Sequence, residues 1–423
     1  MRRSTFACAL VALSLAGCAA SFDSGSKLKS LRVLAVKKDK PYARPGETVH
    51  LQMLLDDPRK LLPDSGTETR EKISIGWLSG CENPKGDSFL GCTSEFASAD
   101  AGSLLHAGFG TLDFDVTLSK DIIPDPLKHP PSNPAEPPNG SSFVFFAVCA
   151  GTLELGGTNG FNCRSSSGKL LGADDFVAGY TQIFAYKQLR NNNPQLSRGS
   201  PSEADPATGF QVNGKNVPLD CFGDACVALE REELGVGLLT NSPPELAAMD
   251  SGSPASPSAS DSGLPDAGVA LFDGGARDAG AVPDAGTMKD AGAPIEKAPL
   301  PSCADGDRRC FPVCTEDDQN NCPKLSVSLD VDKAKSLESD GVAKAIDGRN
   351  VWEQMWINYY TDAGKLEHDV KLLSDATTGW NDAHAADLRV PQTLGTFHVW
   401  AVAHDNRGGV EWARVTLATQ SQN

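Results

Sequence analysis

The chain has 423 residues, a formal net charge of −17 at pH 7 and a hydrophobic fraction of 40%. This length is enough for two or three domains. So acidic a chain is expected neither to bind nucleic acid nor to hold anionic lipid by charge.

The N-terminus has the pattern of a signal peptide. Two arginines precede an apolar run over residues 6–15, which is shorter than the roughly 20 residues needed to cross a bilayer. The motif LAGC at 15–18 resembles the lipobox of bacterial lipoproteins. That resemblance implies that residues 1–17 are removed and that Cys18 takes a diacylglycerol. The alternative is a soluble secreted protein cut near Ala20.

The residues that follow Cys18 bear on its destination. Position 19 is Ala and not Asp, and by resemblance to the lipoprotein sorting rule this implies delivery to the outer membrane, on its periplasmic or its surface face. Residues 18–27 are small and polar, which predicts a flexible tether. We therefore expect the N-terminal lipid to be the contact with the membrane, since acyl chains contribute about 0.8 kcal/mol for each buried methylene.

Ten cysteines remain when Cys8 leaves with the signal peptide and Cys18 is acylated. They are Cys81, Cys92, Cys149, Cys163, Cys221, Cys226, Cys303, Cys310, Cys314 and Cys322. An even number behind an export signal predicts a disulfide framework. The pairs Cys81–Cys92 and Cys149–Cys163 are favoured, because each flanks a predicted strand connection. The last four cysteines could instead form a zinc site, but an oxidising compartment favours disulfides, and we expect no metal or cofactor.

Residues 28–187 contain short runs in which apolar and polar residues alternate, the signature of half-buried strands. The runs fall at 31–36, 48–55, 73–77, 112–118, 143–148 and 179–187. The run at 143–148 is apolar on both faces, so it is expected at the centre of a sheet. Many short strands without a long helix predict an antiparallel β-sandwich.

Residues 188–423 repeat this pattern and predict a second sandwich. A strand is expected at 191–196, and a hairpin at 209–220 around an Asn-Gly turn. Further strands are expected at 325–331, 353–360, 396–404 and 410–417.

Two short motifs carry a resemblance to a known superfamily. The passage from TFHVWAVAH through DNRGG into VEWARVTL is similar to the last hairpin of PKD-like and other immunoglobulin-like bacterial domains, and RPGETV at 44–49 resembles the same superfamily. The resemblance implies an all-β fold of two immunoglobulin-like antiparallel β-sandwiches. It specifies a fold and no activity.

Residues at about 245–300 differ from the rest of the chain. They are rich in Pro, Gly, Ser and Ala, and Asp-Ala-Gly recurs at 266, 278, 284 and 290. Such a composition predicts a disordered linker. We expect it to be an insertion within the second sandwich, with a small separate unit at 190–245 as the alternative. The whole layout resembles the envelope lipoproteins of myxobacterial type, for which no catalytic residues can be carried over.

No set of residues predicts catalysis. Ser88 lies in a Gly-Asp-Ser block without the Asp-x-x-His that an esterase of that type needs, and Ser166 with Lys169 matches only a bare S-x-x-K. His398 and His404 share one strand face about 20 Å apart, so they cannot bind one metal, and we expect them to face solvent.

Tryptophans on the strands offer a second interpretation. Trp77 and Trp356 are expected in the two cores, whereas Trp400 shares the face of the two histidines. An exposed aromatic ring on a sandwich can stack on sugar. We therefore expect a non-enzymatic binding or scaffolding module whose partner is an unknown envelope protein or glycan. The alternative is a surface lipoprotein that binds carbohydrate, peptidoglycan or exopolysaccharide.

Overall fold

The structure is a computed structural model that describes residues 25–58, 73–84, 91–92, 106–109, 111–127, 137–155, 161–197, 209–234, 300–303, 306–337, 339–344 and 350–421. The chain divides into two compact units, one of residues 1–238 with 295–423 and one of residues 239–294. All described residues belong to the first unit. The predicted signal peptide, Cys18 and nearly all of the expected linker lie outside them.

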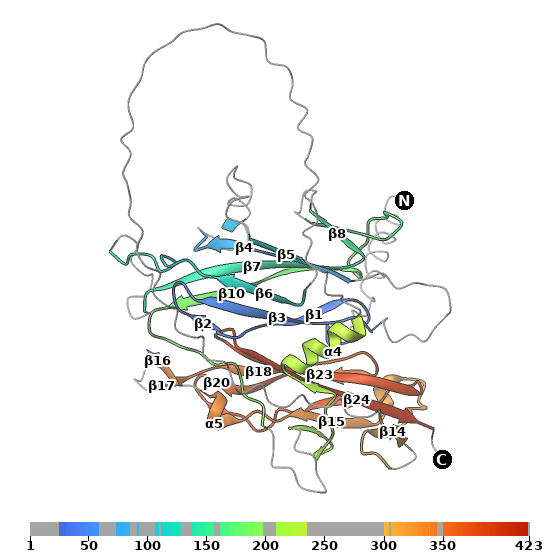
Figure 1. Ribbon diagram of the computed structural model, residues 1–423. Helices are drawn as coiled ribbons and strands as arrows, with labels where there is room; N and C mark the ends of the chain where they lie inside the picture. Colours follow the sequence, from blue (N-terminus) through green and yellow to red (C-terminus); the bar gives the residue numbers. More distant parts are fainter. Residues whose placement is uncertain are drawn as a thin grey trace, which may run out of the picture. The chain divides into compact units, whose positions relative to one another are not determined.

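The N-terminal sandwich has two sheets (Figure 1). The first has the order β1 (Arg32–Lys38), β3 (Thr48–Asp56), β6 (Asp113–Thr117). The second has the order β2 (Tyr42–Ala43), β10 (Phe176–Tyr186), β7 (Asn139–Ala150), β4 (Ile73–Glu82), β5 (His106–Phe109). A separate hairpin joins β8 (Thr152–Leu155) to β9 (Phe161–Arg164).

The alternating residues of these strands build the first core. Val49, Leu51 and Met53 of β3 are fully buried, and they face the second sheet because successive side chains of a strand point to opposite faces. Trp77 is also fully buried and stacks on Phe114, with ring centroids 5.6 Å apart. β7 is the middle strand of its sheet, as its two-sided apolar pattern predicts.

The C-terminal sandwich also has two sheets. One has the order β12 (Lys215–Asn216), β11 (Phe210–Val212), β15 (Lys324–Leu329), β22 (Ala386–Arg389), β19 (Lys365–Glu367). The other has the order β13 (Cys221–Phe222), β24 (Val410–Gln420), β23 (Gly395–Asp405), β18 (Met355–Thr361), β20 (Val370–Asp375), β21 (Gly379–Trp380), and β14 (Cys310–Pro312) also pairs with β24. The fold is therefore all-β, with predominantly antiparallel sheets.

Strands from both sides of residues 235–299 pair within these sheets. β11 pairs with β15, and β13 pairs with β24. The expected strand at 191–196 is instead an extended connection with a single bridge from Leu196 to Val331. The segment before residue 235 thus belongs to the same sandwich as the segment after residue 299.

Short elements complete the described chain. They are α4 (Asp224–Leu234), α5 (Lys333–Ser336), the 3-10 turn η4 (Gln319–Asn321) and the hairpin of β16 (Ser339–Lys344) with β17 (Asn350–Trp352). Helix α4 was not predicted from the sequence. Among the described residues no helix is both long and apolar enough to cross a membrane.

Five disulfides fasten local segments. They join Cys81 to Cys92, Cys149 to Cys163, Cys221 to Cys226, Cys303 to Cys310, and Cys314 to Cys322. The first two are the pairs that the sequence favours. Because the last two use all four cysteines of the alternative zinc site, no free thiolate is left there to bind a metal.

Candidate functional site: the interface between the two sandwiches

The outer face of β23 and β24 is covered by the N-terminal sandwich. Trp400, Val402 and Trp412 are fully buried and belong to the same hydrophobic cluster as the core of β1, β3 and β7. The opposite face of the two strands packs inside the C-terminal sandwich. A sheet that is covered on both faces explains why nearly all residues of β24 are buried.

This arrangement corrects the expectation for the residues on that face. Trp400 is not an exposed platform for sugar stacking, because it is fully buried. His398 is 7% exposed and does not face solvent; its Nδ1 lies 2.8 Å from an oxygen of Asp362. The sequence identified the shared face correctly but not what covers it.

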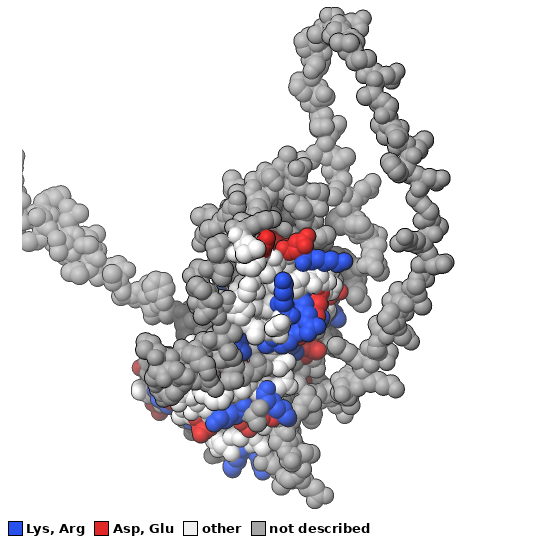
Figure 2. All heavy atoms as spheres, turned by 90° about the vertical axis from the view of Figure 1, so that its left-hand side faces the viewer, with Lys and Arg blue, Asp and Glu red and all other residues white. Residues whose placement is uncertain are grey.

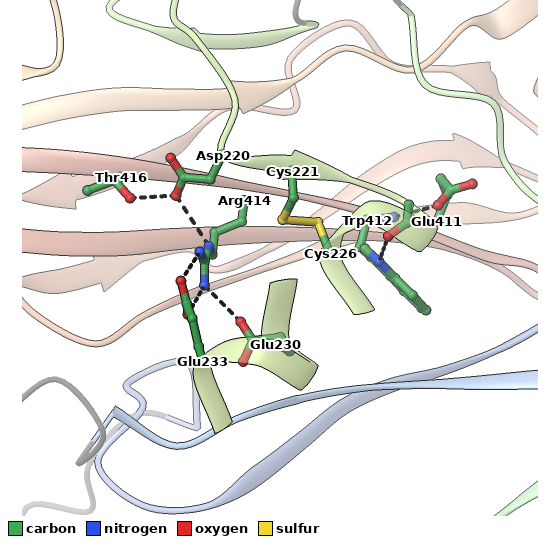
Figure 3. Close-up of a disulfide and its surroundings, with 10 residues drawn as sticks. Asp220, Cys221, Cys226, Glu230, Glu233, Glu411, Trp412, Arg414 and Thr416 are labelled. Carbon is green, nitrogen blue, oxygen red and sulfur yellow. Dashed lines mark hydrogen bonds and ion pairs between the residues drawn. A yellow bond between two sulfur atoms is a disulfide. The ribbon is translucent and has the colours of Figure 1, made fainter. Parts of the chain in front are cut away.

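Arg414 of β24 lies among the carboxylates of Asp220, Glu230 and Glu233 (Figure 3). Its guanidinium is 3.2 Å from Asp220 and 2.8 Å from each of Glu230 and Glu233. It also lies over the ring of Trp400, 5.1 Å from the centroid. Three carboxylates raise the pKa of Arg414 above its usual range although burial opposes its charge, so this cation stays charged in the interior.

Helix α4 supplies two of these carboxylates, and the disulfide Cys221–Cys226 holds its first turn to β13. The carbonyl of Gly223 accepts a hydrogen bond of 2.7 Å from the indole of Trp412. Gly223 has a φ of +52°, and an added Cβ would come within 3.0 Å of a Glu411 oxygen. A glycine at this position therefore lets the chain pass close to β24 and enter the helix.

Lys37 of β1 forms ion pairs across the interface. The Lys37 ammonium lies 3.0 Å from Asp224 at the start of α4 and 3.0 Å from Glu411 on β24. Burial disfavours its charge, but the two carboxylates together raise the pKa of Lys37. Lys37 thus joins β1 of the N-terminal sandwich to α4 and β24 of the C-terminal sandwich.

Lys38, the next residue, is buried without a close carboxylate. It is 4% exposed, its Nζ donates to Thr181 at 3.2 Å, and burial lowers its pKa to about 8. The negative charge of Asp405 opposes this effect. The Asp405 carboxylate accepts hydrogen bonds from Gly409 N at 2.7 Å and from Asn191 Nδ2 at 3.1 Å.

His404 lies on the same face and stacks on Trp356, with ring centroids 5.3 Å apart. Burial, together with the charge of Lys38, lowers the pKa of His404 to about 4. Its Nε2 is buried with no hydrogen-bond partner among the described residues. Trp356 was expected in the core, but the core positions of β18 are Met355 and Ile357 on the other face, and Trp356 is half-buried beside His404.

The remaining candidate residues do not converge. Ser88 lies outside the described residues. Ser166 and Lys169 are exposed in a turn closed by a hydrogen bond from Ser165 N to the Lys169 carbonyl, not on a helix. Within the described ranges no three His, Cys, Asp or Glu side chains are grouped to hold a metal ion.

The interface is suited to fixing two sandwiches together. Lys37 lies against opposite charges across the contact, Arg414 is neutralised beside it, and the rings of Trp400 and Trp412 are buried. Neither the role of Arg414 nor helix α4 was predicted from the sequence. A signal was present in the run ALEREEL at 228–234, which consists of strong helix formers.

The chain was compared with models of protein families and with curated proteins, and neither comparison finds a match.

Proposed function

We propose that this chain is a lipid-anchored protein of the outer membrane that acts as a non-enzymatic binding or scaffolding module. The observation that carries the proposal is the interface. A common hydrophobic cluster and the ion pair of Lys37 with Glu411 join the two sandwiches, and Arg414 is held by carboxylates of α4 within the C-terminal one. Modules of this kind work through exposed loops and strand faces.

The anchor is tested by the mass of the mature N-terminus. We expect a first peptide that begins with Cys18 and carries a diacylglycerol on its sulfur, and a Cys18→Ser variant that moves from the detergent phase to the aqueous phase. A mature chain that begins near Ala20 without lipid would contradict the anchor.

The binding role is tested with the acylated chain in intact envelopes. Chemical crosslinking and identification of the products should give a reproducible envelope protein or glycan, and the Cys18→Ser chain serves as the control for tethering. Turnover of ester, peptide, glycoside or phosphate substrates that is lost with one Ser, His or Asp substitution would contradict the non-enzymatic role. Retention on peptidoglycan would instead favour the carbohydrate-binding alternative, on residues other than Trp400.

A further inference from the structure

The N-terminal end of the described chain is bound to the edge of β18. Thr361 N donates to the Ser26 carbonyl at 2.9 Å, and Leu28 N donates to the Thr361 carbonyl at 2.8 Å. Ser26 and Lys27 were expected in a flexible tether, but they form this parallel bridge and Ser26 is 3% exposed. Any segment that precedes Gly25 must therefore leave the protein beside β18.

β20 lies along the same edge of β18. Asn358 is paired with Val370 of β20, and Thr361, three residues further along β18, is paired with Lys27. β23 occupies the other edge of β18. At about 3.3 Å per residue, the point of exit and Val370 are about 10 Å apart.

β20 presents two aliphatic side chains to solvent at this place. Val370 is 59% exposed and Leu372 is 37% exposed. Leu372 is paired with Trp356, so it lies on the face of the sheet away from the second core. Lys371, between them, points to the other face.

The length of the tether limits how far this face can lie from the bilayer. Cys18 precedes Gly25 by seven residues. Seven residues span at most about 25 Å even when fully extended. An acyl chain on Cys18 must therefore hold Gly25, and the β20 face beside it, close to the membrane surface.

The charge of this part of the chain fits a phospholipid surface. Residues 24–38 contain five Lys or Arg and no Asp or Glu, in a chain that is acidic overall. Of these, Lys29 and Arg32 are exposed. Figure 2 shows Lys and Arg side chains, with some Asp and Glu beside them, on the described part of one face.

We propose that the exposed face of β20, with Val370 and Leu372, rests on the headgroup region of the phospholipid bilayer that holds the lipid of Cys18. The inference depends on the proposed lipid anchor. Aliphatic side chains enter the headgroup boundary, and nearby cations meet phosphate groups. The membrane contact therefore fixes the orientation of both sandwiches.

Site-specific photocrosslinking tests this contact in the full acylated chain. Photoreactive p-benzoylphenylalanine replaces Leu372 in one variant and Val370 in another, and each protein is placed in vesicles of phosphatidylethanolamine and phosphatidylglycerol. After irradiation, mass spectrometry should find phospholipid adducts on the peptide that contains β20. A Cys18→Ser background should lose these adducts.

The matched control is Leu127, which is 93% exposed. Leu127 follows Ile122 in the sequence, and Ile122 lies against Gly140. Gly140 is near the end of β7 and pairs there with Ala185 of β10. That place is at the opposite end of β10 from Asp174, whose carbonyl binds the N-terminal segment. We expect several-fold fewer lipid adducts at position 127 than at 370 or 372.

The outcomes separate the two proposals. Equal lipid adducts at all three positions, or adducts at 370 and 372 with a second copy or another protein, would overturn the inference while the anchor stands. If the N-terminal peptide carries no lipid, the anchor and the inference both fail. Because positions 370 and 372 are both exposed, the variant at one position still tests the membrane contact if the variant at the other position misfolds.

Discussion

Arg414 shows how one buried residue can hold a helix against a sheet. It is 1% exposed and neutralises carboxylates that are themselves buried, of which Glu230 is fully buried and Asp220 is 3% exposed. A buried charge that loses its partner destabilises a fold far more than a lost surface pair does. The contribution of Arg414 is therefore best measured by removing it alone.

Replacing Arg414 with Met should lower the free energy of unfolding by about 3–5 kcal/mol, because Asp220 and Glu230 would stay buried without a cation. The measurement is denaturant unfolding of the oxidised chain without its lipid. The control is Arg164→Met, which removes an exposed pair with Glu154 and should cost less than about 1 kcal/mol. Equal losses in the two variants would mean that the buried network does not stabilise the fold.

His404 should make the fold sensitive to acid. Its pKa is about 4 in the folded chain, against about 6.5 when unfolded. As pH falls from 6.5 to 4 the unfolded chain takes up a proton that the folded chain does not, so stability should fall by up to about 3 kcal/mol. His404→Phe keeps a ring against Trp356 and should flatten the unfolding free energy over this range.

His50 provides a control of opposite sign. Hydrogen bonds to Asp113 and Asp115 raise its pKa to about 9, although burial opposes the shift. A raised pKa adds stability below pH 6.5 that is lost as pH rises toward 9. The stability lost in His50→Gln should therefore shrink across pH 6.5–9, and the loss of stability between pH 6.5 and 4 should remain. If His50→Gln flattened the acid limb as well, the assignment to His404 would be wrong.

Among the elements, α4 depends most on a covalent restraint. It is an 11-residue helix that supplies Glu230, Glu233 and Asp224 to the interface, and residues 235–299 follow it. Isolated helices of this length are marginal in water. Its first turn is fixed by the Cys221–Cys226 disulfide, and its buried residues pack on β3 and β24.

Replacing Cys221 and Cys226 together with Ser should destabilise the chain by about 2 kcal/mol, as expected for a loop of this size. Hydrogen exchange should rise most in the amides of α4. The matched control is the double variant Cys303→Ser with Cys310→Ser, which opens a loop of similar length away from α4. Unchanged exchange in α4, or an equal rise in the control, would contradict a role of the disulfide in holding the helix.

The strands could be predicted from the sequence because their residues alternate. The runs at 48–55 and 112–118 correspond to β3 and β6, and the hairpin of β23 and β24 lies where the DNRGG turn predicts it. A period of two shows which residues share a face. It does not show whether solvent or another sheet covers that face, and for this reason the predicted exposure of Trp400 and His398 was wrong.

Helix α4 was missed for a different reason. The sequence DACVALEREEL has no long apolar stripe, because two of the residues that it turns inward are glutamates paired with a distant arginine. Because Glu230 and Arg414 are far apart in the sequence, their pairing leaves no local periodic signal. The disulfides Cys81–Cys92 and Cys149–Cys163 were easier to predict because each joins cysteines that are close in the sequence.

At the scale of the whole molecule, the two sandwiches should unfold together. The N-terminal core continues across the interface into Trp400, Val402 and Trp412. Lys37 adds ion pairs with Asp224 and Glu411 along the same contact. When two modules share so much buried surface, the loss of one exposes part of the core of the other, which couples their unfolding.

Calorimetry of the oxidised chain without its lipid should therefore show one transition, with calorimetric and van't Hoff enthalpies that agree. Val402→Asp places a charge in the apolar part of the interface, where Val402 is fully buried. Because an unpaired buried charge is costly, we expect this variant to separate the transition into two, with each sandwich unfolding at its own temperature. Leu127→Asp, at an exposed position, should leave the single transition unchanged. Two transitions already in the unmodified chain would mean that the shared core does not couple the sandwiches, and the membrane contact of β20 would then orient the C-terminal sandwich alone.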